Sequence, residues 1–472
     1  MTQSLPASPV DLPATLGALR ASGHEYRTVK RELRDNLLAR LRHDQPRFPG
    51  IVGYEDTVLP EVERAILAGH DMVLLGERGQ GKTRVMRALV ELLDEWTPVI
   101  ADSELNEHPY HPITPAARRR AAQDGDDLPV AWLHRSLRYG EKLATPDTSV
   151  GDLVGDVDPV RVAEGRTLGD PETIHFGLVP RTNRGIFAVN ELPDLAERIQ
   201  VSLLNVLEER DIQVRGYQLR MPLDLLLLAS ANPEDYTNRG RIITPLKDRF
   251  GAEIRTHYPL ELDLEIDLVR QEAFLVAEVP EHVVEVLARF TRAVRESPAV
   301  DARSGVSARF GIAAAETVAA SALRRAGLLG EAHPVARIGD TVSVTSTLRG
   351  KVEFDSGEEG REIEILSHLL RTATADTFRT RLAGLDLSGF TELVAEGQLI
   401  ETGELVAADE VLRQVGPVPG LAKVLDRLDL GDAPNRGEAA AGVEFVLEGL
   451  HLTRRMSKAL TAEGRTLYGS RE

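Results

Sequence analysis

The sequence predicts an α/β protein built on a parallel sheet. Asp71–Leu75 has the character of a short buried strand, and it leads directly into the glycine-rich segment Gly76–Thr83. Arg84–Leu93 then carries apolar residues at helical spacing. Ile186–Val189 and Leu225–Ala229 are continuously apolar, as expected for strands covered on both faces of a parallel sheet. Strands and helices alternate through this part of the chain, which is the pattern of α/β domains.

The glycine-rich segment has the order G-x-x-x-x-G-K-T that binds phosphate. It consists of Gly76, Glu77, Arg78, Gly79, Gln80, Gly81, Lys82 and Thr83. Glycines let backbone N–H groups curl around an anion, and the next helix adds its positive N-terminal dipole. Lys82 can contact the β- and γ-phosphates, and the Thr83 hydroxyl can bind Mg²⁺. We therefore predict a site for a nucleoside triphosphate.

Composition restricts the class of protein. The chain has 472 residues, a formal net charge of −18 and no cysteine. This length suggests about three domains. The absence of cysteine excludes disulfides and thiolate metal sites, and the acidic balance argues against a general nucleic-acid binder. Without an apolar leader or an apolar stretch long enough to cross a bilayer, we expect a cytoplasmic protein that does not bind membranes.

The chain is expected to have four parts. They are an N-terminal helical arm (1–46), an α/β nucleotide-binding domain (47–262), a helical segment (263–330) and a mainly α C-terminal region with a small β element (331–472). The arm is predicted as one amphipathic helix over Thr15–His43. Thr173–Pro180 is predicted as a β-hairpin. Thr341–Val352 alternates in the manner of strands and is the expected β element of the last part.

Polar residues follow two of the predicted strands. Glu191 comes just after Ile186–Val189, and Asn232 follows Leu225–Ala229. In a parallel sheet, residues beyond the carboxyl ends of strands face the ligand crevice. Glu191 is thus a candidate to orient and activate the attacking water, although a solvated loop glutamate is an equal alternative. Asn232 is a candidate to hold water or the γ-phosphate.

The order of these motifs resembles that of AAA+ ATPases, and most closely the ATPase subunit of magnesium chelatase, with MoxR-like ATPases as the close alternative. The resemblance covers about residues 47–325. Besides the phosphate loop, it rests on Phe48–Gly53, Gly185–Leu195, Gln200–Arg210, Val214–Gly216, Ser230–Pro233, Thr244–Phe250 and Gly305–Phe310.

The resemblance implies a role for each matching residue. It assigns phosphate and Mg²⁺ to Lys82 and Thr83, the adenine side to Ile51 and Val52, water activation to Glu191, and the first sensor to Asn232. It makes Arg249 an arginine finger acting on ATP of the neighbouring subunit, and Arg309 the second sensor, carried by a helical lid (263–330). Such action between subunits implies a ring, commonly a hexamer. The segment Thr173–Val179 would match the hairpin that faces the working side of the ring.

One residue departs from the family pattern. Asn190 stands where the family usually has an aspartate that helps to hold Mg²⁺. An amide oxygen can still accept a hydrogen bond from Mg²⁺-bound water, but it lacks the charge. We therefore expect ATP hydrolysis to be functional but slow, and Mg²⁺ binding to depend less on this residue. The variant Asn190→Asp should then differ from the wild type in turnover or in Mg²⁺ affinity.

Three functions follow as hypotheses. The first is the motor subunit of a magnesium chelatase-like complex, with ATP and Mg²⁺ as cofactors and a separate tetrapyrrole-binding subunit. The second is a MoxR-like chaperone. In both, the resemblance implies a separate partner with a von Willebrand A domain, because Asp386–Phe390 lacks the second serine of that domain's metal loop. A nucleic-acid motor is disfavoured by the acidic balance.

A metal site at His108 and His111 is also disfavoured. The two histidines are separated by Pro109 and Tyr110 and followed by Pro112. Those prolines oppose a helical pair of ligands, and no thiol completes a site. Packing within a loop is the expected role of both histidines.

Overall fold

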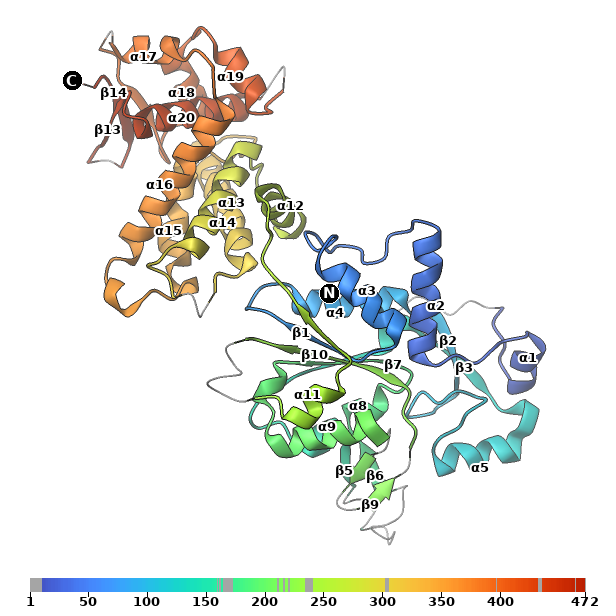
Figure 1. Cartoon of the computed structure of the whole chain (residues 1–472). Coiled ribbons are helices and arrows are strands. Elements are labelled where there is room, and N and C mark those ends of the chain that lie inside the picture. The colour runs from blue at the N-terminus through green and yellow to red at the C-terminus, as the bar shows by residue number, and fades with distance from the viewer. Residues whose placement is uncertain are drawn as a thin grey trace. The chain divides into compact units, whose positions relative to one another are not determined.

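The structure is a computed structural model of the chain (Figure 1). It describes residues 11–158, 160, 163, 173–209, 212–214, 217–219, 221–233, 241–301, 305–395, 397–431, 435–462 and 464–471. The chain divides into two compact units, Met1–His257 and Tyr258–Glu472. The finer division into four parts stays a prediction.

A five-stranded sheet forms the centre of the first unit. Its order is β11 (Ala252–Arg255), β1 (Met72–Leu75), β10 (Leu225–Ala231), β7 (Gly185–Asn190) and β4 (Tyr139–Leu143). Every neighbouring pair is parallel. All residues of β1, β7 and β10 are buried. The predicted α/β fold class and its three predicted strands are therefore confirmed.

Helices cover both faces of this sheet (Figure 1). On one face lie α2 (Val29–Arg42), α3 (Val58–Ala68) and α4 (Lys82–Ala88); on the other lie α8 (Leu178–Arg181), α9 (Glu197–Glu209) and α11 (Thr244–Arg249). A hydrophobic core lies on each face of the sheet. Successive residues of a strand pack alternately in these two cores, because their side chains point to opposite faces. Leu74 packs in the α2–α3–α4 core, whereas Val73 and Leu75 pack in the other.

The N-terminal arm differs from the prediction of one continuous helix. It contains two helices, α1 (Leu16–Ala21) and α2. A second helix begins because Thr28 has extended backbone geometry and its hydroxyl caps the Arg31 N–H at 3.3 Å. The intervening residues include Gly23, which has no side chain to continue an amphipathic face.

A buried ion pair ties α2 to the sheet. Both oxygens of Glu32 accept hydrogen bonds from the Arg138 guanidinium, at 2.6 and 2.7 Å, and both side chains are almost fully buried. Nearby, Lys30 pairs with the buried Asp71 at 2.8 Å. Removing one partner of a buried pair leaves an uncompensated charge. The arm is thus held to the first unit by charge pairing as well as by apolar packing.

Smaller elements complete the first unit. They include the antiparallel pairs β2–β3 (Trp96–Ile100, Val130–His134), β5–β6 (Gly155–Val157, Ile174–Phe176) and β8–β9 (Ile212–Val214, Tyr217–Leu219), with helices α5 (Pro115–Asp124) and α6 (Val150–Leu153). The hairpin predicted over Thr173–Pro180 is wrong. Only β6 is a strand there, and the short helix α8 follows it. Pro180 does not prevent this helix, because proline is tolerated in the first helical turn. In the quoted motif Val214–Gly216, Arg215 and Gly216 lie outside the described residues.

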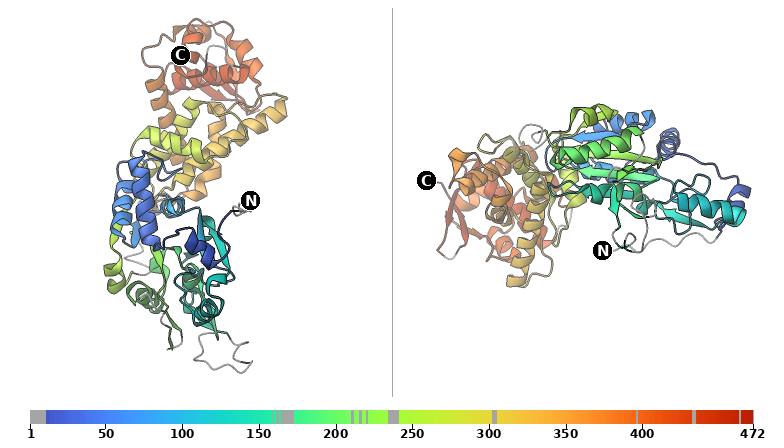
Figure 2. Two further views of the ribbon diagram at one scale, coloured as in Figure 1. Left: turned by 90° about the vertical axis from the view of Figure 1, so that its right-hand side faces the viewer. Right: turned by 90° about the horizontal axis from the view of Figure 1, so that it is seen from below.

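The second unit is mainly helical. Its helices are α12 (Leu262–Glu272), α13 (Glu281–Glu296), α14 (Ala308–Leu329), α15 (Val342–Leu348), α16 (Glu362–Arg381), α17 (Ser388–Ala395), α18 (Ala408–Val415), α19 (Leu421–Arg427) and α20 (Arg436–Leu452). Helix α13 packs beside α14 and α16 (Figures 1 and 2). A small antiparallel sheet has the order β12 (Ile400–Thr402), β14 (Thr466–Gly469) and β13 (Ser457–Leu460).

The β element predicted at Thr341–Val352 is wrong. This segment forms α15 and short 3₁₀ turns, because Val344, Thr345 and Leu348 together make one buried helical face. The alternation of Val with Ser and Thr concealed that spacing. The small sheet of the second unit comes instead from β12, β13 and β14.

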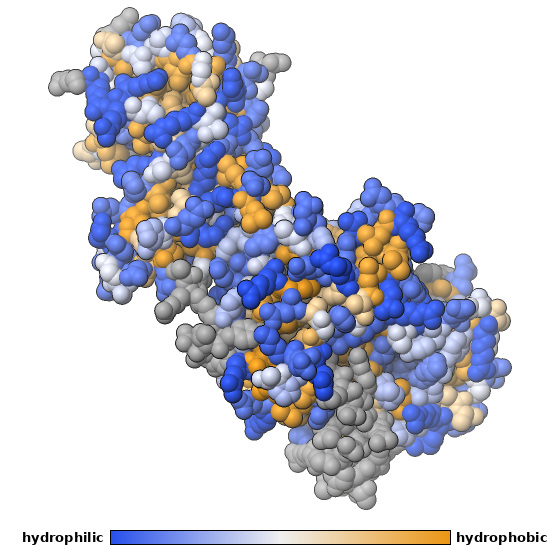
Figure 3. Space-filling view, viewed as in Figure 1, coloured by the Kyte–Doolittle hydropathy of each residue, from blue (hydrophilic) through white to orange (hydrophobic). Residues whose placement is uncertain are grey.

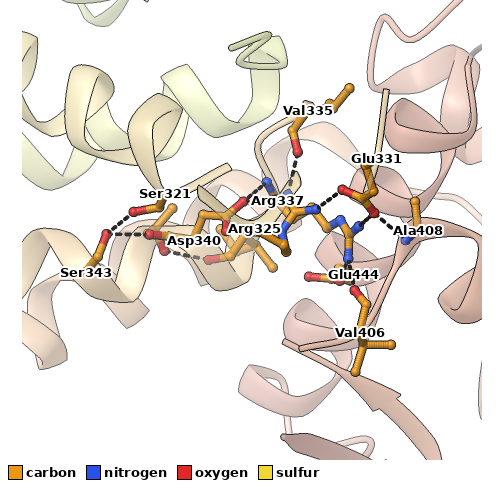
Figure 4. A network of polar contacts seen from close by, with 12 residues as sticks. Ser321, Arg325, Glu331, Val335, Arg337, Asp340, Ser343, Val406, Ala408 and Glu444 are labelled. Atoms are coloured by element: carbon orange, nitrogen blue, oxygen red, sulfur yellow. Dashed lines mark hydrogen bonds and ion pairs between the residues drawn. The ribbon is translucent and has the colours of Figure 1, made fainter. Parts of the chain in front are cut away.

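Buried arginines link distant parts of the second unit (Figure 4). Arg325 on α14 pairs with Asp340 at 3.0 Å, and Arg337 pairs with Glu331 at 2.6 Å and with Glu444 of α20 at 3.0 Å. Both arginine side chains are about 1% exposed. Truncating one member of such a network costs roughly 3–5 kcal/mol.

The surface in Figure 3 is mostly hydrophilic, with scattered apolar patches. Among the residues that the structure describes, no helix combines the length and apolar character that crossing a membrane requires.

Acid should destabilise the second unit through His282 of α13. The side chain is fully buried, and among the described residues neither ring nitrogen has a hydrogen-bond partner. Burial, with a smaller effect of Arg381, lowers the pKa of His282 to about 3. Below pH ~6.5 the unfolded chain binds a proton that the folded chain does not, so stability is lost as the pH falls.

We expect this loss to be about 2 kcal/mol between pH 7.5 and pH 5. Urea unfolding of His282→Leu should show a smaller pH dependence than the wild type by about that amount. An unchanged pH dependence would contradict this account of His282.

Candidate functional site

The phosphate loop joins β1 to α4. Gly79 and Gly81 have φ angles of 76° and 74°, and Gly81 is the N-cap of α4. Residues with a Cβ rarely adopt this left-handed conformation, which explains both glycines. The turn presents the N-terminal end of α4, with its unsatisfied N–H groups, to the concave side of the loop. The backbone conformation is the one that the motif predicts, and its role in binding an anion stays a prediction.

Close packing fixes the base of the loop. A Cβ on Gly76 would overlap Thr256 Oγ1 and Gln80 Oε1. Thr256 donates to Gln80 Oε1 at 2.8 Å, and the single proton of the Tyr54 hydroxyl lies between the carbonyl oxygens of Gln80 and of His257. Burial raises the pKa of Tyr54 to about 12, so this phenol remains a donor at neutral pH. A cleft of about 310 Å³ opens beside the loop.

Lys82 lies at the centre of the site and is 7% exposed. Its ammonium donates to the carbonyl oxygens of Gly76 and Glu77, the latter at 2.9 Å, and to Asn232 Oδ1 at 2.8 Å. The ammonium thus has three oxygen acceptors within the protein. Phosphate oxygens are acceptors of the same kind and could take the place of these protein oxygens. The structure therefore brings Lys82 and Asn232 together, as their positions after β1 and β10 predict.

Glu191 joins the same group of residues. Its Oε2 accepts a hydrogen bond of 2.8 Å from Asn232 Nδ2, and its backbone N–H donates to Ser230 Oγ at 3.2 Å. Glu191 has a φ of 55°, a left-handed conformation that is uncommon for a residue with a side chain. Such strain is retained where the surrounding contacts determine it. Glu191 is therefore half-buried and held by these contacts, and its role in activating water stays a prediction.

Asn190 lies between the loop and two strands. Its Oδ1 accepts hydrogen bonds from Thr83 Oγ1 at 3.1 Å and from Ser230 Oγ at 3.2 Å. On the other side, its Nδ2 donates to Glu141 Oε1 at 2.6 Å. The two residues predicted on the Mg²⁺ side, Thr83 and Asn190, are therefore in contact, and Glu141 adjoins them.

Glu141 was missed in the sequence. It lies on β4, where Tyr139–Leu143 carries charged residues and lacks the apolar run that identified the other strands. Its carboxylate also makes a two-pronged contact with Arg87 of α4, at 2.8 Å to Nε and 3.0 Å to Nη2. The hydrogen bond to Glu141 raises the pKa of Arg87. Glu141 thus connects β4, β7 and the helix after the loop.

The predicted adenine-side residues are half-buried. Ile51 packs against the core under α2, α3 and α4, and Val52 follows it. Arg84 of α4 donates to the carbonyl oxygen of Gly50 at 2.9 Å, which connects this segment to the helix that follows the loop. The role of Ile51 and Val52 in binding adenine stays a prediction, as does any contact of the exposed Arg78 within the loop.

The two predicted arginines are both exposed. Arg249 ends α11, is 43% exposed and pairs with Asp248 at 3.4 Å. Arg309, also exposed, begins α14 in the second unit, where its backbone N–H donates to Ser307 Oγ at 3.1 Å. Their roles as arginine finger and second sensor stay predictions.

The residues present fit a magnesium nucleotide. A phosphate cradle, a buried lysine, a threonine hydroxyl and carboxylate or amide oxygens are the groups that such a ligand needs. The roles of Thr83 and Asn190 toward a cation, and of Glu191 and Asn232 toward the terminal phosphate, stay predictions. This arrangement can bind a nucleoside triphosphate and position a water molecule.

His108 and His111 belong to a different environment. His108 stacks on His24, with their Nε2 atoms 3.2 Å apart, and its Nδ1 accepts from the Tyr110 N–H. Burial lowers the pKa of His108 to about 2. Within the part of the chain that the structure describes, no group of three or more His, Cys, Asp or Glu residues is placed to hold a metal ion. The contacts are those of loop packing.

Comparison with known proteins identifies similar chains. No protein-family model matches. Magnesium-chelatase subunit ChlI of Nostoc sp. (strain PCC 7120 / SAG 25.82 / UTEX 2576) is 28% identical over 232 residues, which is 48% of this chain and 58% of that protein. The ChlI subunit of Pyropia yezoensis is 30% identical over 227 residues, which is 46% of this chain and 60% of that protein. The chain thus spans about three fifths of these curated relatives, and the predicted resemblance to this subunit is confirmed.

Solved structures show weaker likenesses. One chain of the complex between subunits BchI and BchD of magnesium chelatase aligns with 67% of this chain and 98% of its own length, at 20% identity and a TM-score of 0.35. NtrX from Brucella abortus aligns with 76% of this chain and 72% of its own length, at 14% identity and a TM-score of 0.39. Scores this low support no inference about function.

Substitution of Gly76 should disable the site. Gly76→Ala places a methyl group against Thr256 and Gln80, which hold the loop, so we expect at least ~10-fold weaker binding of a fluorescent ATP analogue. Gly151→Ala is a matched control in the same unit, because its Cβ would meet neighbours only at 3.5 Å or more. Equal binding by the two variants would contradict the packing account of the loop.

Proposed function

We propose that the protein is an AAA+ ATPase that couples ATP hydrolysis to work on a protein partner. The observation that carries this proposal is the hydrogen-bonded series Lys82–Asn232–Glu191, which joins the phosphate loop to the ends of β10 and β7. Similarity to magnesium-chelatase subunits supports it. ATP and Mg²⁺ are the proposed cofactors.

In the proposed mechanism, the loop N–H groups and Lys82 bind the phosphates. Lys82 exchanges its carbonyl acceptors for phosphate oxygens, which keeps its donors satisfied. Thr83 and Asn190 provide oxygen atoms on the cation side, and Mg²⁺ when bound offsets phosphate charge. Glu191 orients a water molecule and accepts its proton, while Asn232 holds the Glu191 carboxylate in place.

We further propose that the active form is a ring, with six subunits as the expected number. Arg249 is exposed at the end of α11, as a residue that acts on a neighbour's ATP must be. A positive charge supplied by another subunit stabilises the phosphoryl-transfer transition state. Arg309 would act as the second sensor from the lid. In this arrangement, hydrolysis depends on contact between subunits.

The finer proposal is the motor subunit of a magnesium chelatase-like complex. It would act with a von Willebrand A-domain protein and with a subunit that binds a tetrapyrrole. The names of the similar proteins favour this assignment. The alternative is a MoxR-like chaperone that acts on an A-domain protein without tetrapyrrole chemistry.

Glu191→Gln should separate binding from hydrolysis. Loss of the carboxylate removes the proton acceptor, so phosphate release should fall by about 10²-fold or more while ATP stays bound. The matched control is Glu61→Gln, an exposed residue in the first turn of α3. Unchanged phosphate release by Glu191→Gln would contradict the assigned role of Glu191.

The ATP-bound Glu191→Gln protein also identifies the partner. We expect a pull-down to retain an A-domain protein together with a large tetrapyrrole-binding subunit. Retention of an A-domain protein alone would contradict the chelatase assignment and favour the chaperone, with the ATPase proposal intact.

Mixing two inactive variants should test the ring. Glu191→Gln subunits retain Arg249, and Arg249→Ala subunits retain Glu191, so a mixed ring contains interfaces where both residues are native. We expect each variant alone to be inactive and the mixture to recover measurable phosphate release. Activity in Arg249→Ala alone, or no recovery on mixing two variants that assemble, would contradict action between subunits.

A further inference from the structure

Asn190 presents a problem of orientation at the metal side of the site. An asparagine amide has an oxygen acceptor on one side and an NH₂ donor on the other, so rotating it by half a turn exchanges the two. An aspartate has no such difference, because both of its carboxylate oxygens accept. With an asparagine at this position, the site functions in only one of the two orientations.

The hydroxyl neighbours of Asn190 do not determine the orientation. Thr83 and Ser230 both contact Asn190 Oδ1, but a hydroxyl can either donate or accept and would tolerate the reversed amide. Glu141 is different, since an ionised carboxylate only accepts. Its contact of 2.6 Å with Asn190 Nδ2 therefore selects the orientation in which Oδ1 faces Thr83.

The orientation matters because of the Thr83 proton. When Asn190 Oδ1 accepts that proton, the lone pairs of the Thr83 oxygen remain available for a cation. In the reversed amide, Nδ2 would donate to the Thr83 oxygen and occupy one of those lone pairs. It would also direct N–H groups toward a positive ion.

We propose that Glu141 is the positioning residue of the magnesium site: it holds the Asn190 amide so that Oδ1 accepts the Thr83 proton and the lone pairs of the Thr83 oxygen stay available to Mg²⁺. This inference rests on the proposed function as a magnesium-dependent ATPase. It assigns to β4 a role in a site otherwise built from β1, β7, β10 and the loop.

The position of Glu141 is set by the first unit itself. Strand β4 pairs with β7 so that Glu141 lies opposite Ala188 and Leu143 opposite Asn190. Arg87 donates a hydrogen bond to each of the two Glu141 carboxylate oxygens. It does so from the solvent side, since the Arg87 side chain is 63% exposed and that of Glu141 is 21% exposed. The carboxylate is therefore oriented by contacts that do not involve a ligand.

The same geometry makes Asn190 and Glu141 interdependent. In Asn190→Asp, two carboxylates would lie where the structure has a hydrogen bond of 2.6 Å, and one of them would have to move or bind a proton. Restoring the usual aspartate should therefore weaken the site unless Glu141 is also neutralised. In Asn190→Asp/Glu141→Gln, the amide at position 141 donates to the new carboxylate, so donor and acceptor are exchanged.

The test uses the full-length chain and measures Mg²⁺ binding rather than turnover. A fluorescent ATP analogue is bound first in EDTA, which reports on folding and on the loop, and Mg²⁺ is then titrated into the complex. The variants are Glu141→Ala, Glu141→Gln, Asn190→Asp and Asn190→Asp/Glu141→Gln. Glu91→Ala is the matched control, because Glu91 pairs with Arg135 at 2.6 Å in the same unit and no contact described here joins it to the site.

We expect Glu141→Ala and Asn190→Asp each to weaken Mg²⁺ binding by about 10-fold or more, with metal-free nucleotide binding unchanged. The double variant should stay within about threefold of the wild type. Glu141→Gln should fall between the wild type and Glu141→Ala, because its amide can either accept from or donate to Asn190. Phosphate release at saturating and at low Mg²⁺ should follow the same order.

Two results would overturn the inference alone. One is Mg²⁺ binding in Glu141→Ala equal to that of Glu91→Ala, and the other is Asn190→Asp binding Mg²⁺ at least as tightly as the double variant. Failure of the wild type to bind the nucleotide in EDTA and in Mg²⁺ would instead contradict the proposed function on which the inference rests.

Discussion

The parallel register of β1, β10 and β7 is the constraint on which the site depends. Leu75 lies opposite Ala231, and Ala229 lies opposite Val189, so the three strands end at one edge of the sheet. Each strand then delivers a functional segment there: the phosphate loop after β1, Asn232 after β10 and Glu191 after β7. Because these strands are buried on both faces, a shift in register would disrupt two cores as well as the site.

The contacts among the candidate site residues were largely predictable, because these residues belong to motifs that are local in sequence. The loop residues are contiguous, and residues after apolar strands can be assigned to one edge of a parallel sheet without knowledge of the fold. Contacts between Lys82, Asn232 and Glu191 follow from that rule. Arg249 and Arg309 are different, because the roles proposed for them depend on a neighbouring subunit and on a lid, and such roles are not visible in the contacts of one unit.

Errors arose where local pattern and packing disagree. Thr341–Val352 alternates in sequence, yet Val344, Thr345 and Leu348 pack as one face of α15, so burial against other helices decided the structure. Strand β4 has no apolar run, because it is an edge strand whose residues are only partly buried. Glu141 was missed for that reason, and only the pairing of β4 with β7 brings it to Asn190.

The departure at Asn190 has a physical context that the sequence did not reveal. An amide there removes one negative charge from the end of β7, but a carboxylate on the adjacent strand lies 2.6 Å away. The sequence alone predicts a weakened metal site. The structure adds that Asn190 is the donor and Glu141 the acceptor of a hydrogen bond beside that site.

The central claim is that the edge formed by β1, β10 and β7 binds a magnesium nucleotide. The most direct measurement is a cryo-EM or crystal structure of the protein with Mg²⁺ and a slowly hydrolysed ATP analogue. The account predicts a triphosphate in the loop Gly76–Thr83, with the Lys82 ammonium on phosphate oxygens and the cation beside Thr83 Oγ1. A nucleotide bound elsewhere, or a loop without ligand in which Lys82 still contacts Gly76 and Glu77 at saturating nucleotide, would contradict it.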